Sequence, residues 1–165
     1  MNTDKQLLTK SNIVVVGNGM VGHHFVEEMA KNPNYQITVL SAESRLAYDR
    51  VHLSEYFGGK TADDLAMTTP EHYEELGVTF KTDAKVILID KAVQYVTTEN
   101  GDTYHYDKLI LATGSYPFVP PIPGKDQDHC LVYRTIDDLE DIAASAKESK
   151  VGVVIGGGLL GLEAA

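Results

Sequence analysis

The stretch that decides the fold is IVVVGNGMVG, at residues 13–22. Its first four residues form a continuous β-branched run, which is typical of a strand buried on both faces of a parallel sheet. Gly17, Gly19 and Gly22 then follow in the spacing GxGxxG, and from Met20 onward apolar residues recur at helical spacing. The first glycine permits a tight turn, the second lets the backbone approach a diphosphate, and the third allows close packing of helix on strand. The stretch therefore predicts a strand–turn–helix corner that binds a dinucleotide.

A second strand and a carboxylate extend this corner. Residues 37–40 (ITVL) form another short apolar run, and Glu43 follows it, about 20 residues after the last glycine of the pattern. An acidic side chain at that distance accepts hydrogen bonds from the hydroxyls of a ribose. The opening of the chain therefore predicts the strand–helix–strand unit of a Rossmann-like α/β fold.

The segments that follow predict more elements of the same fold class. Residues 86–90, 93–98 and 103–106 alternate between two faces, and Asn100-Gly101 is a strong hairpin signal, so we expect a β-meander. Four prolines between residues 117 and 123 predict an extended connector. The other expected elements are strands at 78–80, 109–112 and 151–155, a short helix between the cap Thr69 and Gly77, and a longer helix at 136–146.

A second GxGxxG pattern, formed by Gly156, Gly158 and Gly161, follows the strand expected at 151–155 and predicts a second dinucleotide site. Because a strand with only a stub of helix cannot bury its own apolar face, we expect the chain to be the front part of a longer protein. The expected organisation is a first dinucleotide-binding domain at 1–120, a connector and helix at 121–150, and the start of a second such domain at 151–165.

The composition disfavours several classes of function. The chain has 165 residues, a formal net charge of −10 and one cysteine, Cys130. The negative charge makes nucleic acid and anionic membranes poor partners. A single cysteine rules out a disulfide framework or a cysteine-rich cluster within the chain, and the histidines lack metal-binding spacing, so no metal site is expected. Without a membrane span or signal-peptide pattern, a cytoplasmic location is expected.

Several strings of the sequence resemble a known superfamily. They are GNGMVGH at 17–23, LAYDRVHLS at 46–54, ATGSYP at 112–117, VYRT at 132–135 and GGGLLGLEAA at 156–165. With the two glycine patterns, they resemble the FAD-dependent pyridine nucleotide-disulfide oxidoreductases over nearly the whole chain. The string at 46–54 resembles the corresponding segment of rubredoxin and ferredoxin reductases. The other four are most similar to the N-terminal part of the assimilatory nitrite reductase (NAD(P)H) large subunit.

The resemblance implies FAD at the first glycine pattern and NADH or NADPH at the second. It implies that Arg50 stabilises phosphate charge, that Val86 contacts the adenine through its backbone, and that residues 112–114 line the flavin. Glu43 would bind the adenosine ribose. The complete set of implied cofactor-binding residues is Gly17, Asn18, Gly19, Met20, Val21, Gly22, Glu43, Arg50, Val86, Ala112, Thr113, Gly114, Gly156, Gly158 and Gly161.

The resemblance also implies a reaction, in which electrons pass from NAD(P)H via FAD to a downstream centre. In nitrite reductase this centre is the iron–sulfur and siroheme part, outside this chain, that reduces nitrite to ammonia. No cysteine lies between residues 1 and 129, so no thiol relay is expected near the flavin. Hydride transfer to a flavin requires no acid or base, so no catalytic residue is assigned.

Two alternatives stay open at this point. The first is a reductase that serves a free carrier of the rubredoxin or ferredoxin type. The second is a flavin-binding scaffold or sensor without turnover. The expected partners are the dinucleotides themselves and a downstream redox domain or carrier, and a homodimer or a small-subunit partner is compatible with the resemblance.

Overall fold

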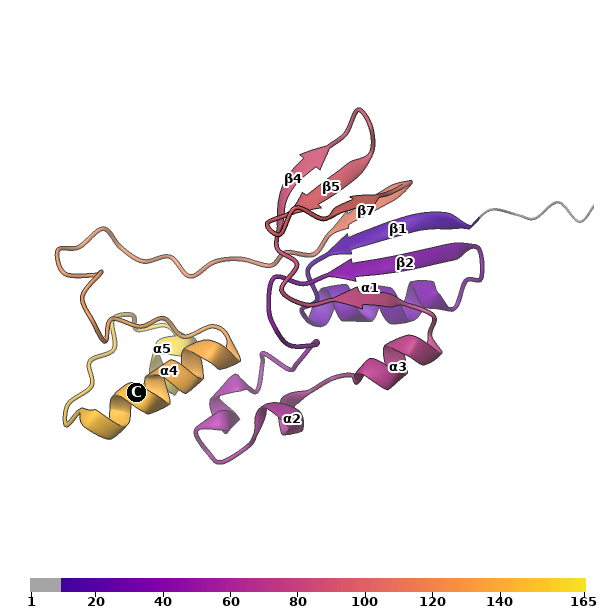
Figure 1. The fold of residues 1–165 in the computed structure, drawn as a ribbon. Coiled ribbons are helices and arrows are strands. Elements are labelled where there is room, and N and C mark those ends of the chain that lie inside the picture. Colours follow the sequence, from indigo (N-terminus) through magenta and orange to yellow (C-terminus); the bar gives the residue numbers. More distant parts are fainter. Residues whose placement is uncertain (1–9) are drawn as a thin grey trace, which may run out of the picture. The chain divides into compact units, whose positions relative to one another are not determined.

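The computed structural model describes residues 10–165, which divide into two compact units. Unit 1 consists of the chain up to Tyr48 together with Met67–Gly114, and unit 2 consists of Asp49–Ala66 and Ser115–Ala165. Figure 1 shows their helices and strands, coloured along the chain. Within residues 10–165, no helix combines the length and the apolar character needed to cross a membrane.

Unit 1 is built on a four-stranded sheet in which every neighbouring pair of strands is parallel. In spatial order its strands are β3 (Thr79–Lys81), β2 (Tyr35–Leu40), β1 (Ser11–Val16) and β7 (Lys108–Leu111). Val16 of β1 is in register with Leu40 of β2 and with Leu111 of β7. The carboxyl ends of these three strands therefore meet at one edge of the sheet, the edge at which α/β folds bind ligands.

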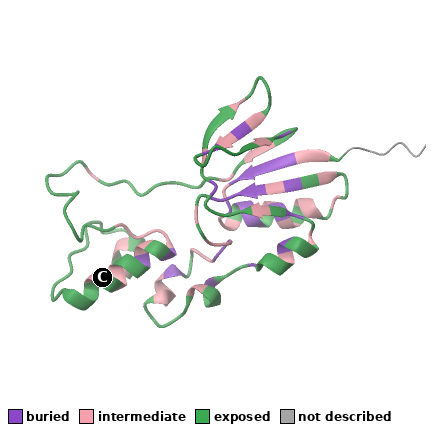
Figure 2. Cartoon of the chain, in the orientation of Figure 1, coloured by how far each residue is buried: buried purple, intermediate pink, exposed green. Residues whose placement is uncertain are grey.

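Alternate residues of β1 are buried on opposite faces of this sheet, so the burial predicted for residues 13–16 is confirmed (Figure 2). On one face, Ile13 and Val15 belong to a core cluster with residues of helices α1 (Met20–Ala30) and α3 (Pro70–Glu75). On the other face, Val14 and Val16 belong to a second cluster that includes Val96. The helix predicted from Met20 and the one predicted after Thr69 are both confirmed.

The second face is covered by a three-stranded antiparallel sheet, as the β-meander prediction requires. Its strands are β4 (Val86–Asp90), β5 (Tyr95–Thr98) and β6 (Thr103–His105), in that order. Gly101, with φ +87, lies in the predicted hairpin between β5 and β6. The strand expected from residue 93 begins only at Tyr95, because Gln94 has φ +56 and strand residues do not adopt the left-handed region.

Unit 2 is helical in the part of the chain that the structure describes. Its elements are the 3-10 helix η1 (Leu53–Tyr56), α2 (Ala62–Leu65), α4 (Ile136–Glu148) and α5 (Leu159–Ala164). The helix predicted at 136–146 is confirmed as α4, which buries Ile136 and Leu139. The strand predicted at 151–155 is wrong, since these residues are exposed and not in a strand. A strand exists only with a hydrogen-bonded neighbour, and unit 2 offers none among the described residues.

Candidate dinucleotide-binding site

Backbone contacts that require glycine close the turn between β1 and α1. Gly17 has φ +102, and its N–H donates to the carbonyl oxygen of Leu40 at 2.8 Å. A Cβ on Gly17 would overlap the backbone carbonyl oxygen of Ala112, and a Cβ on Gly22 would overlap the carbonyl oxygen of Gly17. The turn therefore brings the ends of β1, β2 and β7 into close backbone contact. We call residues 17–22 the corner.

Helix α1 begins at this corner without a side-chain cap. Its N-cap residue is Gly19, and its first turn contains no acidic residue. By contrast, the side chains of Thr61, Thr69 and Thr135 accept backbone hydrogen bonds at the starts of α2, α3 and α4. The N–H groups at a helix N-terminus carry partial positive charge, and without a capping side chain they suit an external anion such as a phosphate.

Glu43 lies just beyond the end of β2, at the same sheet edge as the corner. Its N–H donates to the Ser41 hydroxyl oxygen at 3.2 Å, and the hydroxyl of the buried Tyr48 donates to its Oε2 at 2.8 Å. The Tyr48 hydroxyl therefore orients the carboxylate, and Ser41 fixes the backbone of Glu43, at the place where a ribose acceptor is expected. Sequence reasoning missed this role of Tyr48, because an aromatic residue five positions away is equally typical of a core.

The end of β7 completes the sheet edge. The N–H of Ala112 donates to the carbonyl oxygen of Val16 at 2.8 Å, and Gly114 has φ +69. The structure thus brings together the corner, Glu43 and the segment from Ala112 to Gly114. Val86 lies elsewhere, at the start of β4, where it packs against the second core cluster.

The remaining predicted site residues belong to unit 2. Arg50 donates from Nη1 to the carbonyl oxygen of Arg134 at 3.3 Å, which ties it to the string VYRT. Helix α5 has Gly158 as its N-cap residue, again without a side-chain cap, and Gly156 has φ +133. A Cβ on Gly161 would overlap the carbonyl oxygen of Gly156. The second glycine pattern therefore has the same local turn as the corner, although no strand precedes it.

A chain of polar side chains, buried at its inner end, lies beside the corner, and we call it the corner network. The Tyr73 hydroxyl donates to Asn18 Oδ1 at 2.9 Å, and His23 Nδ1 lies 2.8 Å from the same hydroxyl oxygen. Glu27 lies beyond them, with Oε2 3.7 Å from His23 Nε2 and Oε1 3.1 Å from His72 Nε2. Burial raises the pKa of Tyr73 to about 12, so its hydroxyl stays protonated as a donor.

His23 makes the stability of unit 1 sensitive to acid. Burial lowers the pKa of His23 below its ordinary value of 6.5, while Glu27 opposes this shift and His72 and His24 add to it. His23 therefore binds a proton more tightly in the unfolded chain than in the folded one. The contribution of His23 to stability is present above pH 6.5 and is lost as the pH falls through the lowered value.

We therefore expect the His23→Gln variant to lose less stability than the wild type between about pH 7.5 and about pH 5.5. Urea unfolding at the two pH values measures this difference. His24→Gln, at the exposed neighbouring position, is the control and should keep most of the wild-type pH dependence, because His24 is the smallest of the named influences on the pKa of His23. The explanation is wrong if His23→Gln shows the wild-type pH dependence.

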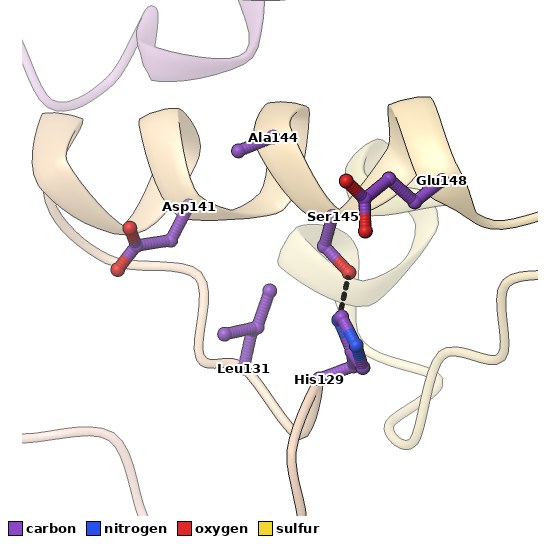
Figure 3. A pocket seen from close by; sticks show the side chains of 6 residues that line it. All are labelled: His129, Leu131, Asp141, Ala144, Ser145 and Glu148. Carbon is purple, nitrogen blue, oxygen red and sulfur yellow. Dashed lines mark hydrogen bonds between the residues drawn. The ribbon is translucent and has the colours of Figure 1, made fainter.

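Unit 2 also contains an open cavity of about 310 Å³ beside α4 (Figure 3). Its lining residues are His129, Leu131, Asp141, Ala144, Ser145 and Glu148. His129 Nδ1 lies 2.8 Å from the Ser145 hydroxyl oxygen, and His129 is exposed while Ser145 is half-buried, so the pair is not enclosed away from water. Among residues 10–165, no three His, Cys, Asp or Glu side chains are grouped to hold a metal ion.

The parallel sheet, the glycine corner and the carboxylate after β2 define a dinucleotide-binding α/β protein. The chain belongs to the pyridine nucleotide-disulphide oxidoreductase family, whose model matches residues 11–165. It is 49% identical over 161 residues to the nitrite reductase (NAD(P)H) large subunit of Klebsiella oxytoca, covering 96% of this chain and 17% of that protein. The nitrite reductase (NADH) large subunit of Escherichia coli is 47% identical, with coverages of 96% and 19%.

The solved structures that this chain resembles belong to the same class of protein. The water-forming NADH oxidase of Lactobacillus brevis matches with a TM-score of 0.84 and 31% identity, over 93% of this chain and 36% of that one. The NADH:rubredoxin oxidoreductase of Clostridium acetobutylicum matches with a TM-score of 0.82 and 29% identity, over 94% and 40%. The chain therefore spans only 17–19% of the length of the two nitrite reductase subunits, and less than half of these solved chains.

Proposed function

We propose that this chain is the FAD-binding portion of an NAD(P)H-dependent oxidoreductase of the nitrite reductase large-subunit type. The main support for a dinucleotide site is the glycine N-cap of α1. It leaves the helix N-terminus open to a diphosphate at the carboxyl edge of the sheet. The 49% identity over 96% of the chain supports nitrite as the final acceptor.

The residues of unit 1 fit FAD at the corner. Gly17 and Gly22 keep the backbone compact, where any Cβ would overlap a carbonyl oxygen, and Gly19 exposes the first turn of α1 to the diphosphate. Glu43, oriented by Tyr48, would accept from the adenosine ribose. Residues 112–114, at the adjoining strand end, would line the flavin. Asn18, Met20 and Val21 would contribute backbone to the same corner.

The other predicted residues complete the proposal. Val86 would contact the adenine through its backbone, and Arg50 would stabilise phosphate charge. Gly156, Gly158 and Gly161 would hold the diphosphate of NADH or NADPH, since their turn repeats the local geometry of the corner. FAD, when bound, supplies a carrier that accepts a hydride and releases electrons. The chain's own part is to bind and orient the two nucleotides.

The wider organisation is part of the same proposal. Residues 1–120 would form the first part of the FAD-binding domain, 121–150 a connector and helix, and 151–165 the start of the NAD(P)-binding domain. Iron–sulfur and siroheme groups would belong to a part of the protein outside this chain. We also propose a cytoplasmic location, with a downstream redox domain as the electron acceptor and a homodimer or small subunit as the assembly.

Anaerobic titration of the whole protein tests this function. We expect one set of flavin absorption bands that NADH or NADPH bleaches. We also expect a siroheme absorption band, which returns to its oxidised form when nitrite is added. Rapid reduction of added rubredoxin without a siroheme band would favour the carrier reductase, whose structural support is the likeness to NADH:rubredoxin oxidoreductase. If neither nucleotide bleaches the bound flavin, the remaining function is that of a flavin-binding scaffold or sensor.

Tyr48→Phe is expected to weaken FAD binding about tenfold, the effect of losing one hydrogen bond to a charged group. The phenylalanine keeps the buried ring but leaves Glu43 without its hydroxyl donor. Equilibrium binding of FAD to the apoprotein measures the effect. Tyr95→Phe, in β5, is the control and should bind like the wild type. Unchanged affinity in Tyr48→Phe would contradict the assigned role of the Tyr48–Glu43 pair.

A further inference from the structure

The corner network has a fixed hydrogen-bond direction. An amide oxygen only accepts, so the proton between Tyr73 and Asn18 Oδ1 belongs to Tyr73. The Tyr73 oxygen then accepts from His23, which places the His23 proton on Nδ1. The other ring nitrogen of His23 faces Glu27. The direction of each bond thus follows from the orientation of the Asn18 amide.

That orientation leaves one donor of the network unused. Asn18 is 7% exposed, Tyr73 1% and His23 3%, so the network is buried at its inner end. The Asn18 Nδ2 atom is fully buried and has no hydrogen-bond partner among the described residues. Burying an amide N–H without an acceptor is costly, and native proteins rarely keep such a group. Asn18 itself lies between Gly17 and Gly19, within the corner that we propose for the diphosphate.

We propose that Tyr73 and His23 are positioning residues for the corner, holding the Asn18 amide so that its NH₂ group donates to an acceptor oxygen of the bound dinucleotide. This inference rests on the proposed function, since it requires FAD at the corner. Helix α3 lies outside the glycine pattern, and through Tyr73 it takes part in recognising the dinucleotide. Tyr73, from α3, contacts the Asn18 amide directly, and His23, from α1, acts on it through the Tyr73 hydroxyl.

Asn18→Asp isolates the NH₂ group. The aspartate has the shape of asparagine and still offers an oxygen to the Tyr73 hydroxyl, but it replaces the donor by a negatively charged acceptor. We expect FAD to bind to this variant about a hundredfold more weakly than to the wild type, and to Asn18→Ala about tenfold more weakly. Fluorescence quenching of FAD added to the apoprotein measures both. An Asn18→Asp variant that binds as tightly as the wild type, or more tightly than Asn18→Ala, would overturn the inference.

A double-mutant comparison tests whether Tyr73 acts through Asn18. Tyr73→Phe should weaken FAD binding several-fold in the wild-type background and have no further effect in the Asn18→Ala background, because its partner is then absent. A purely structural role would give equal losses in both backgrounds and would overturn the positioning role. Tyr106→Phe is the matched control, since Tyr106 is also buried in unit 1 and its hydroxyl donates to the backbone carbonyl oxygen of Asp90 instead.

Two readouts separate the inference from the proposed function. Thermal unfolding of each apoprotein identifies variants that fail to fold, and ADP serves as a second probe that carries the diphosphate without the flavin. If the wild type binds neither FAD nor ADP, the proposed function itself fails. If the wild type binds both and Asn18→Asp binds both equally well, only the role of the Asn18 amide fails.

Discussion

Gly17→Ala is expected to yield a protein that is purified without FAD and is less stable than the wild type. The backbone at this position has φ +102, which alone costs an L-residue about 1–2 kcal/mol. The added Cβ would also overlap the carbonyl oxygen of Ala112, so the ends of β1 and β7 must separate. Because the diphosphate is proposed to lie on this backbone, the displacement removes the site.

Gly101→Ala separates the two causes. Gly101 has φ +87 in the hairpin between β5 and β6, but a Cβ there would have nothing within 4 Å. This control therefore carries the backbone strain without the overlap and should retain FAD. The flavin-to-protein absorbance ratio and urea unfolding measure both properties. If Gly17→Ala retains FAD as fully as Gly101→Ala, close backbone approach at the corner is not needed for binding.

Gly19→Asp is expected to affect stability and binding in opposite directions. Gly19 has φ −77 and ψ −173, the extended conformation that N-cap residues adopt, so an aspartate fits the backbone there. Its carboxylate would cap α1 and raise the free energy of unfolding of the apoprotein by a few tenths to about 1 kcal/mol. The same carboxylate would occupy and repel the place of the diphosphate, so FAD affinity should fall at least about a hundredfold.

Gly19→Ser is the companion variant, because serine caps a helix without adding charge. It should stabilise the apoprotein similarly and weaken FAD binding less than aspartate does. Equilibrium unfolding and FAD titration of the two apoproteins give the comparison. Tight FAD binding by Gly19→Asp would mean that the N-terminus of α1 does not meet the diphosphate.

The elements that rest on local patterns could be predicted from the sequence. The run at 13–16 is apolar at every position because β1 is buried on both faces, and Thr69 with Pro70 predicts the start of α3. Asn100-Gly101 likewise predicts the β5–β6 hairpin. In each case the signal and the structure involve the same few residues.

Features that depend on residues far apart in the sequence could not be predicted. Residues 151–155 have the composition of a strand, but pairing decides whether a strand forms, and the described part of unit 2 provides no neighbour. The corner network joins Asn18 to Tyr73, which lie 55 positions apart in the sequence. Tyr73 also has the helical position of an ordinary core residue, so no local pattern distinguishes it as a partner of the corner.

A structure of the whole protein with FAD bound shows where the diphosphate lies. We expect it against the backbone of residues 17–22, over the first turn of α1, with a ribose hydroxyl on Glu43. Density for FAD that meets none of these residues, or a diphosphate held by other side chains while the first turn of α1 faces solvent, would contradict it.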